Sequence, residues 1–512
     1  VFVLLSLLGM VAALVADKMR PGMILFSVVV LFLCAGILTP KEMLEGFSNK
    51  GMITVALLFL VSEGIRQSGT LGQVIKKLLP QGKTTVFKAQ LRILPSVAFI
   101  SAFLNNTPVV VIFAPIIKHW AKSVNLPATK FLIPLSYVTI LGGICTLIGT
   151  STNLVVHGMI LEAGFEGFSM FELGKVGIFI AIAGIIYIFL FSKRLLPDAR
   201  PDTAVPDEEV EEGEKLHRVE AILGARFPGI NKKLKDFNFQ RHYGAEVKEI
   251  KTRNGQRFVT NLEDVVLHEG DTLVVMADDT FIPTWGESSV FVLLTNGNEP
   301  DTTGKKKRWF ALLLLVLMIV GATVGELPVT KEMFPDIKLD MFFFVSITTI
   351  IMAWTNLFPA RKYTKYISWD ILITIACAFA ISKAMVNSGV ADSVAKFIIG
   401  LSDDYGPHVL LAMLFIITNL FTELITNNAA AALAFPLALS IASQLGVSPT
   451  PFFVVICMAA SASFSTPIGY QTNLIVQGIG NYKFTDFVRI GLPLNIITFL
   501  ISIILIPLIW NF

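Results

Sequence analysis

Residues 146–158 read Thr-Leu-Ile-Gly-Thr-Ser-Thr-Asn-Leu-Val-Val-His-Gly, and residues 466–478 read Thr-Pro-Ile-Gly-Tyr-Gln-Thr-Asn-Leu-Ile-Val-Gln-Gly. The two stretches are identical at eight of thirteen positions, at a spacing of 320 residues. Each interrupts a long apolar run with glycine, hydroxyl and amide groups, which break a helix and supply oxygen atoms. We therefore interpret them as matching helix breaks in two copies of one repeat.

The same spacing relates positions upstream of the two breaks. It aligns six residues of one apolar run with six of another: Thr54, Ala56, Phe59, Ser62, Ser68 and Gly69 with Thr374, Ala376, Phe379, Ser382, Ser388 and Gly389. Between these segments, Asn106 and Pro115 align with Asn427 and Pro436 after a slip of one residue. Agreement over three segments in the same order predicts two copies of one structural unit.

The composition indicates a polytopic membrane protein. Of the 512 residues, 54% are hydrophobic and 15% are charged, whereas soluble domains carry about 25% charged residues. A net charge of +3 over 512 residues is too small to indicate a surface that binds nucleic acid. The four cysteines stand in apolar stretches without metal-ligand spacing, which predicts neither disulfides nor zinc. We find no nucleophile–base pair or phosphate loop, so we expect a protein that is not an enzyme and has no organic cofactor.

Charge divides the chain into three blocks. Residues 1–193 and 309–512 are dominated by apolar runs and are the two predicted membrane repeats, whereas residues 194–308 are polar and hold an acidic stretch at 207–214. A transmembrane helix needs about 20 apolar residues. The predicted spans are 1–16, 22–39, 52–66, 131–163 and 172–192 in the first repeat, and 309–326, 340–358, 369–387, 451–480 and 488–511 in the second.

Each repeat also contains an apolar stretch centred on an asparagine pair, at 93–117 and at 408–443. Polar tips inside apolar stretches are typical of re-entrant hairpins, in which non-helical backbone is buried in protein. We predict hairpin tips near 105–107 and 426–428, facing broken helices near 149–153 and 466–473. Five crossings per block is an odd number, so the second copy is inverted. Inverted repeats with broken helices are the signature of secondary transporters.

Lysine and arginine orient the chain, because cytoplasmic loops carry an excess of both. With residue 193 inside, the inside segments of the first repeat hold Lys18, Arg20, Arg66, Lys76, Lys77, Lys83, Lys88, Arg92, Lys118, Lys122, Lys130, Lys193 and Arg194. Residues 194–308 are then cytoplasmic, and we expect a plasma membrane, the inner one in bacteria. Because residue 1 is Val, we expect the natural chain to begin earlier, with one more helix.

The middle block reads as a small soluble domain. Alternating residues predict short strands at 245–250, 257–260 and 272–276, with Asn254-Gly255 as a hairpin turn. Together with the membrane repeats, this predicts the fold class: a polytopic α-helical membrane protein with two inverted repeats, re-entrant hairpins and broken helices, plus a small α/β cytoplasmic domain.

The polar groups of each repeat suit a hard cation, which prefers oxygen ligands. One repeat offers the tip Asn105-Asn106-Thr107 and a break from Gly149 to Asn153. The other offers the tip Thr426-Asn427-Asn428 and a break from Gly469 to Asn473. Two related Na⁺ sites are therefore expected, with a shared pocket between the tips. The half-helices after each asparagine point positive dipole ends into that pocket, which suits an anion.

Charge arithmetic favours more than one coupling ion. A dianion that enters against a potential of about −100 mV costs roughly 4.6 kcal/mol. Two Na⁺ ions cancel that electrical cost, and a third makes uptake voltage-driven. The two visible sites are the minimum for a dianion, and the sequence indicates no third.

These features together resemble the divalent anion/sodium symporter family, within the ion transporter superfamily. The resemblance covers both membrane repeats and includes the segment Thr466-Pro467-Ile-Gly. That family carries Ser-Asn-Thr at each tip. Here the central asparagine is kept, but the triplets read Asn105-Asn106-Thr107 and Thr426-Asn427-Asn428.

The resemblance implies a homodimer in the lipid bilayer, with a scaffold and a mobile transport domain that moves as an elevator. It implies that Asn106 and Asn427 contact both the anion and Na⁺, and that Thr466 and Pro467 border the anion. For the Na⁺ ligands it implies one set in each repeat: Gly149, Thr150 and Asn153, and Gly469 and Asn473.

Residues 217–282 resemble the C-terminal subdomain of potassium-conductance regulators, called TrkA-C or RCK-C. The marks are Arg241-His-Tyr-Gly244, the Asn-Gly turn, and Leu267-His-Glu-Gly-Asp-Thr-Leu-Val-Val275. Such domains dimerise and bind small ligands, which implies a nucleotide-type regulatory ligand. A symporter with this domain resembles the sulfate-type members, so sulfate is the leading substrate and a dicarboxylate the next.

Two other functions stay open at this stage. A cation/proton antiporter of the same superfamily would need a buried carboxylate, such as Glu63 or Glu423. The regulator-like block also suggests a ligand-gated channel, although a channel needs a symmetric pore. Glu63 and Lys383 occupy equivalent repeat positions, and Glu423 lies one helical turn before the second tip, where it could support the tip.

Overall fold

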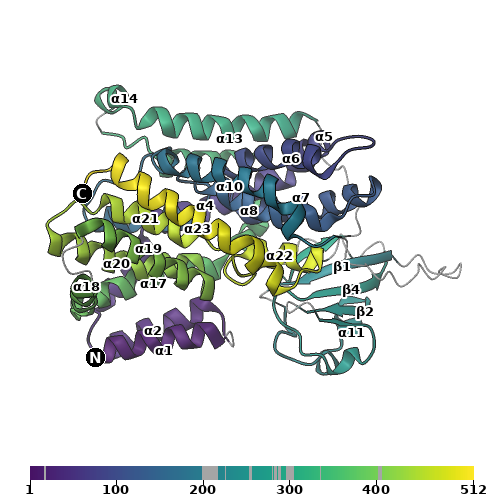
Figure 1. The fold of residues 1–512 in the computed structure, drawn as a ribbon, viewed down its shortest axis with the longest axis horizontal. Helices are drawn as coiled ribbons and strands as arrows, with labels where there is room; N and C mark the ends of the chain where they lie inside the picture. Colours follow the sequence, from purple (N-terminus) through teal and green to yellow (C-terminus); the bar gives the residue numbers. More distant parts are fainter. Residues whose placement is uncertain are drawn as a thin grey trace, which may run out of the picture.

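The protein is an elongated body of helices with a small sheet at one end and the C-terminus at the other (Figure 1). The computed structural model describes residues 1–16, 19–198, 217–224, 227–252, 256–278, 281, 285, 290–295, 305–334, 336–401 and 406–512. The acidic stretch at 207–214 and the predicted turn at Asn254-Gly255 lie outside the described residues.

The first membrane block contains a hairpin and a broken helix. Helices α6 and α7 form the hairpin, and α8 and α9 are the halves of the broken helix. The helices are α1 (Phe2–Ala16), α2 (Pro21–Cys34), α3 (Pro40–Glu45), α4 (Lys50–Gln67), α5 (Thr70–Leu78), α6 (Val86–Ser101), α7 (Asn106–Ser123), α8 (Leu132–Gly143), α9 (Ser151–Glu162) and α10 (Gly174–Leu195). Short 3₁₀ segments lie at Gly46–Ser48 and Ala128–Lys130.

The second membrane block has the same order of elements. Its hairpin is α19 and α20, and its broken helix is α21 and α22. The helices are α13 (Lys305–Gly325), α14 (Pro328–Met333), α15 (Met341–Trp354), α16 (Tyr363–Tyr366), α17 (Trp369–Asn387), α18 (Val390–Leu401), α19 (Gly406–Leu424), α20 (Asn427–Leu445), α21 (Thr450–Ser461), α22 (Gln471–Gly480) and α23 (Phe484–Ile509). A 3₁₀ segment lies at Ala360–Lys362.

The two blocks pack as images of each other. Helix α2 packs against α17, and its counterpart α15 packs against α4. Likewise α7 packs against α22, and α20 packs against α9. The aligned glycines Gly69 and Gly389 both adopt left-handed backbone, at φ +69° and +67°, a conformation that favours glycine. This exchange of partners confirms the predicted fold class with two inverted repeats.

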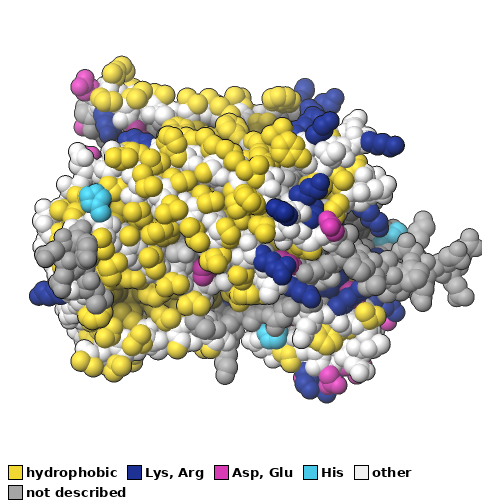
Figure 2. All heavy atoms as spheres, viewed as in Figure 1, with side chains coloured by type: hydrophobic (Ala, Val, Ile, Leu, Met, Phe, Trp, Pro, Cys, Tyr) yellow, Lys and Arg dark blue, Asp and Glu magenta, His cyan; other side chains and the backbone are white. Residues whose placement is uncertain are grey.

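The helical body suits a lipid environment. Among the described residues, seven helices are long and apolar enough to cross a membrane, and apolar side chains cover much of the face in Figure 2. Exposed large apolar residues follow one another along α10, α13 and α23, for example Ile178, Ile182, Leu313, Leu317, Leu500 and Ile504. The halves of each broken helix are shorter than a full span, because two of them share one crossing.

The sheet is antiparallel with the order β3-β2-β4-β1-β5. Its strands are β1 (His217–Leu223), β2 (Glu246–Lys251), β3 (Arg257–Phe258), β4 (Thr272–Ala277) and β5 (Phe291–Thr295), and short helical turns lie at Leu234–Asp236, Phe239–Tyr243 (α11) and Leu262–Asp264. Strands β2, β3 and β4 match the predicted ones, whereas β1 and β5 were not predicted. Strand β5 lies beyond the predicted domain core of 217–282.

Two glycines bring the last helix of each repeat onto the break of the same repeat. Gly177 on α10 lies against the Ile144 carbonyl, and Gly491 on α23 lies against the Phe464 carbonyl. Ile144 and Phe464 are equivalent at the spacing of 320, so the two contacts are one contact made twice. A β-carbon at either glycine would overlap the carbonyl group, which only glycine avoids.

We predict that Gly491→Ala lowers the thermal stability of the purified protein in detergent. The methyl group must push α23 away from the Phe464 carbonyl, and overpacking of this kind costs about 1–3 kcal/mol. Gly9→Ala on α1 is the matched control, because a β-carbon there meets nothing within 4 Å. Equal melting temperatures for the two variants would contradict the close contact.

Candidate functional site

The tip of each repeat lies against the broken helix of the other repeat. The Thr107 hydroxyl donates to the Gln471 side-chain oxygen at 3.2 Å. The Ser151 hydroxyl donates to the Asn428 side-chain oxygen at 3.1 Å. Thr107 is equivalent to Asn428, and Ser151 to Gln471, so these are the same contact made in both directions. The structure therefore brings both predicted tips and both predicted breaks together.

Thr150 and Tyr470 mark the pseudo-two-fold axis. They are equivalent at the spacing of 320 and have nearly the same extended backbone, with φ of −140° and −138°. Their hydroxyl oxygens are 3.0 Å apart. Equivalent residues of two related copies can touch only beside the axis that relates them. Helices α7, α9, α20 and α22 all begin next to this point, with their positive dipole ends toward it.

Tyr470 is a site residue that the sequence reasoning missed. Its hydroxyl is 2.7 Å from the Asn106 side chain and interacts also with the Asn427 side chain. The tyrosine is buried and thereby joins the central asparagines of both tips at the axis. The sequence does indicate this residue, because Tyr470 aligns with Thr150 of the first break. The two residues differ, however, so a comparison that counts only identical positions does not reveal it.

Asn153 and Asn473 stabilise the two helix breaks. Asn153 Nδ2 donates to the Thr146 carbonyl at 2.9 Å and to the Gly143 carbonyl at 3.4 Å. Asn473 Nδ2 donates to the equivalent carbonyls of Thr466 and Ser463 at 3.1 and 2.9 Å. These bonds satisfy carbonyls that the interrupted helices leave free.

The side-chain oxygens of these two asparagines differ. Asn473 Oδ1 accepts from the Ser136 hydroxyl at 2.7 Å. Asn153 Oδ1 is buried and has no hydrogen-bond donor. The first repeat therefore holds a buried oxygen that is available to a cation.

Thr466 fixes its break to the hairpin that precedes it. The hydroxyl accepts from the Gly469 amide and donates to the Glu423 carbonyl, at 3.2 and 3.1 Å. Thr146 makes the equivalent bonds to Gly149 and Ala102. The Thr466 side chain is thus already engaged in the break, and Pro467 is buried beside it.

The Asn106 carboxamide sits among oxygen atoms. Its Oδ1 lies 2.8 Å from Ser101 Oγ, and its Nδ2 faces Tyr470. The same end of the carboxamide lies 3.1 Å from the Thr139 carbonyl and 3.3 Å from the Gly149 carbonyl. Turning the carboxamide over would make Nδ2 a donor to all three oxygens. Four oxygens thus converge when Oδ1 faces inward, an arrangement that a cation stabilises.

The other predicted tip residues lie at helix starts. Asn105 and Thr426 precede the first residues of α7 and α20, and the Thr426 hydroxyl accepts from the Ala429 amide at 3.4 Å. Asn427 Oδ1 accepts from the Asn428 amide at 3.0 Å. A side chain at Gly469 would meet the Thr422 carbonyl and the Ser463 hydroxyl, so glycine is needed there for close approach of the backbone.

The intramembrane charges singled out in the sequence are separated by the structure. Glu63 forms an ion pair with Arg66 on the same helix, with Nη2 and Oε1 2.6 Å apart, and Lys383 is exposed. Glu423 instead contacts the second break, through the Ser465 amide at 2.9 Å. The expectation was that Glu423 supports the second tip, whereas its side-chain contacts are with the second break and with α23.

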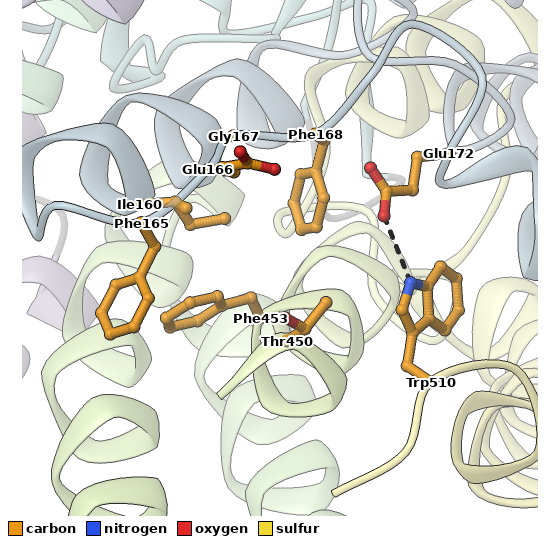
Figure 3. Close-up of a pocket in the computed structure, with 9 residues that line it drawn as sticks. All are labelled: Ile160, Phe165, Glu166, Gly167, Phe168, Glu172, Thr450, Phe453 and Trp510. Carbon is orange, nitrogen blue, oxygen red and sulfur yellow. Dashed lines mark hydrogen bonds between the residues drawn. The ribbon is translucent and has the colours of Figure 1, made fainter. Parts of the chain in front are cut away.

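A cavity of about 280 Å³ lies where α9 ends and α21 begins, at the end of the body opposite the sheet. Figure 3 shows the Glu166 carboxylate and the Phe168 ring beside it, and the bond from Trp510 Nε1 to Glu172 at 3.2 Å. Its lining is Ile160, Phe165, Glu166, Gly167, Phe168, Glu172, Thr450, Phe453 and Trp510. None of the predicted site residues is among them, and its two carboxylates suit cations rather than anions.

The sheet docks directly on two helices that carry site residues. Lys118 on α7 bonds both oxygens of Glu220 on β1 at 3.1 Å. Ile222 of β1 belongs to the apolar core of the helical body. Gly478 on α22 leaves room for Thr272, since a β-carbon there would meet the threonine hydroxyl. The sheet therefore contacts the half-helices that follow the first tip and the second break.

Electrostatics favour this docking contact. Burial would raise the pKa of Glu220, but the positive charges of Lys118 and Lys251 outweigh it and bring the pKa to about 2. A carboxyl group with a lowered pKa stabilises the folded state above its unfolded value of 4.5 and loses that effect as the pH falls toward 2. The ion pair is therefore intact throughout the physiological pH range.

Comparisons with known proteins agree with this architecture. The citrate transporter family (CitMHS) matches residues 11–442 and 337–511. An uncharacterized transporter, sll0640, of Synechocystis is 30% identical over 94% of this chain and 93% of its own length. A probable sodium/sulfate cotransporter 3 of Chlamydomonas reinhardtii is 23% identical over 94% of this chain and 85% of its own length.

A solved structure shares the fold. The YdaH transporter of Alcanivorax borkumensis superposes with a TM-score of 0.52 at 12% sequence identity, covering 91% of this chain and 87% of that one. Further relatives are named as sodium/sulfate and Na⁺/citrate cotransporters, and one of Chlamydomonas reinhardtii is named as a putative sulfur deprivation response regulator. With two inverted helical repeats and a family match over most of its length, the chain belongs to the citrate transporter family of integral membrane transporters.

Proposed function

We propose that the protein is a Na⁺-coupled symporter of a divalent anion, sulfate first and a dicarboxylate next. The observation that carries the proposal is the meeting of four helix N-termini at the pseudo-two-fold axis, beside Thr150 and Tyr470. Helix N-termini bind anions through free amides and the helix dipole. The relatives named as sodium/sulfate and Na⁺/citrate cotransporters support the substrate class.

The first Na⁺ site is centred on Asn106. In the orientation with Oδ1 inward, the Asn106 oxygen, the Ser101 hydroxyl and the Gly149 carbonyl converge. Such a cluster of oxygens repels itself unless a cation or a proton donor lies within it, and hard cations prefer these ligands. The unpartnered Oδ1 of Asn153 lies in the adjoining break. Thr150, which follows Gly149 in the same break, completes the set.

The second Na⁺ site is the image of the first, at Asn427, Gly469 and Asn473. Gly469 brings the backbone of the break close to the Thr422 carbonyl and the Ser463 hydroxyl. The anion lies between the two Na⁺ ions, bordered by Asn105, Asn106 and Thr107 from one tip, by Thr426, Asn427 and Asn428 from the other, and by Thr466 and Pro467. Two Na⁺ neutralise the dianion, so that the loaded site crosses the membrane without net charge.

We further propose that the protein works as a homodimer with an elevator mechanism. In this proposal α1, α2, α4, α13, α15 and α17 are the scaffold, and the hairpins, the broken helices, α10 and α23 are a second group. The two groups meet where α4 contacts α9 and α17 contacts α20. The second group holds every proposed ligand, so it can move as a unit with its cargo. The apolar face seen in Figure 2 is, in this proposal, the surface that contacts lipid.

The sheet is proposed to be a cytoplasmic regulatory domain of the TrkA-C type with a nucleotide-type ligand. Lysine and arginine side chains gather at the end of the helical body nearest the sheet (Figure 2), as expected of a cytoplasmic face. Because the sheet contacts α7 and α22, a ligand that shifts it would act on the transport group.

The proposed function predicts Na⁺-dependent uptake of labelled sulfate by reconstituted vesicles. A Na⁺ gradient, but not an equal K⁺ gradient, should drive accumulation, and competition with malate, citrate, thiosulfate and arsenite should rank the substrates. Uptake that ignores Na⁺, or proton flux without any anion dependence, would refute symport and favour an antiporter.

For the first tip, we predict that Asn106→Ala weakens sulfate uptake by about 10- to 100-fold. The change removes a side chain that is proposed to contact both Na⁺ and sulfate. We expect this size of effect because a hydrogen bond to a charged group contributes about 1.5–3 kcal/mol. Asn106→Asp should be worse for the anion, because it places a negative charge beside it. Asn387→Ala, at an exposed asparagine, is the matched control. Normal uptake by both Asn106 variants would remove the tip from the site.

For the docking contact, we predict that Lys118→Gln increases the maximal uptake rate about two- to tenfold, because the change frees α7 from the sheet. The size of the effect follows from the ion pair, which contributes about 1 kcal/mol to the docking. Glu220→Gln should have the same effect, and the double variant no more than either alone. Lys235→Gln, which breaks an exposed pair with Asp264 elsewhere in the sheet domain, is the control.

Since the pKa of Glu220 is about 2, the gain from Lys118→Gln should be constant between about pH 5 and 8. A gain that depends on pH in this range, or additive effects of the two single variants, would show that the pair does not restrain transport.

A further inference from the structure

Glu423 is a membrane carboxylate held by neutral hydrogen-bond donors. Its Oε1 accepts from the Ser465 amide at 2.9 Å and from Asn495 Nδ2 at 2.7 Å. The Ser463 hydroxyl lies 3.5 Å from Oε2. Within the described residues, no lysine or arginine forms an ion pair with it. A carboxylate at this depth is costly unless a cation accompanies it.

Buried polar atoms without partners continue from Glu423 along three helices. We call the residues that carry them, on α19, α21 and α23, the polar seam: Thr418, Ser461, Asn495 and Ser502. Their side chains are at most 7% exposed. The three helices pack against one another, and the Phe415 and Phe499 rings, 5.3 Å apart, show how close α19 and α23 lie. Burying a polar group without a hydrogen-bond partner destabilises the fold, so the presence of four such groups in one place calls for an explanation.

The first repeat provides an internal control for packing. The contacts of Gly177 and Gly491 with equivalent carbonyls align α10 with α23, and the two tips and the two breaks align the other helices. The counterparts of the polar seam are then all apolar: Val97, Leu141, Ala181 and Ile188. The counterpart of Glu423 is Ala102. Because the same helices pack equally well without polar groups, packing does not explain the seam.

We propose that Glu423 binds a third Na⁺, together with the carbonyl oxygen of Asn495. Asn495 Nδ2 faces Glu423 Oε1 and the Ser465 hydroxyl, which is 2.8 Å away. Turning this carboxamide over brings its unpartnered Oδ1 to the same place, so that carboxylate, carbonyl and hydroxyl oxygens converge as a hard cation requires. The polar seam extends from this site along α19, α21 and α23, and offers the ion a route.

This inference rests on the proposed symport and completes its charge balance. Two symmetric Na⁺ ions neutralise a dianion and leave the cycle electroneutral. A third Na⁺ adds one positive charge per cycle, so that the membrane potential drives uptake. The asymmetry between the copies thereby converts a neutral carrier into an electrogenic one.

The test uses the full-length protein reconstituted in lipid vesicles. It measures the ratio of ²²Na⁺ to labelled sulfate taken up, and it derives the charge moved per sulfate from reversal potentials. The wild type should carry three Na⁺ and one net charge. Glu423→Gln should carry two Na⁺ and no net charge, with sulfate uptake retained under a Na⁺ gradient. Glu63→Gln, which alters a membrane carboxylate outside the seam, should match the wild type.

A second pair of variants keeps the inference testable if Glu423→Gln does not fold. Thr418→Val and Ser502→Ala remove seam hydroxyls with little change of shape, and should slow ²²Na⁺ entry without changing the affinity for sulfate. A ratio of three in Glu423→Gln would overturn the site. If the wild type carried two Na⁺ per sulfate and still moved one net charge, Glu423 would bind a proton in place of Na⁺. That result would overturn the third Na⁺ site. Wild-type uptake without Na⁺ dependence would instead refute the proposed symport itself.

Discussion

A helix that stops inside a membrane exposes amides and carbonyls that hydrocarbon cannot hydrogen-bond. Each repeat of this protein has four such helix ends, two at its hairpin tip and two at its helix break. The rest of the structure supplies hydrogen-bond partners for them or covers them. Asn153 and Asn473 bond the free carbonyls of their breaks. Gly177 and Gly491 let α10 and α23 cover the breaks closely. The free amide ends then meet at the axis among buried side chains, where a low dielectric strengthens their attraction for an anion.

The equivalent residues of the two copies do structural work, and the differences between the copies carry specificity. Asn153 and Asn473 make the same bonds, but only Asn153 keeps an oxygen without a donor. Thr150 and Tyr470 share one backbone conformation, yet the larger side chain reaches across the axis to Asn106. The polar seam exists in the second copy alone. An inverted repeat therefore explains the fold, and the departures from it explain how the proposed ions are distributed.

The repeat, the hairpins and the breaks were predictable from the sequence, because identical residues with the same task recur at one spacing. Tyr470 was missed because it replaces Thr150, so a search for identities could not reveal it. The polar seam was also missed, since its four residues come from three helices and only their packing brings them together. Strand β1 has a mixed pattern of exposed and buried positions, because one side of it faces the helical body, and this hid it from a search for alternation.

The central claim is that one anion lies between the N-termini of α7, α9, α20 and α22, and anomalous scattering from selenate tests it most directly. Selenate has the shape and charge of sulfate, and a crystal grown with it and with Na⁺ would show the anion through its selenium signal. The account predicts a peak at the pseudo-two-fold axis, within hydrogen-bonding distance of Asn106 and Asn428. A peak held instead by lysine or arginine side chains, with none at the axis, would contradict it.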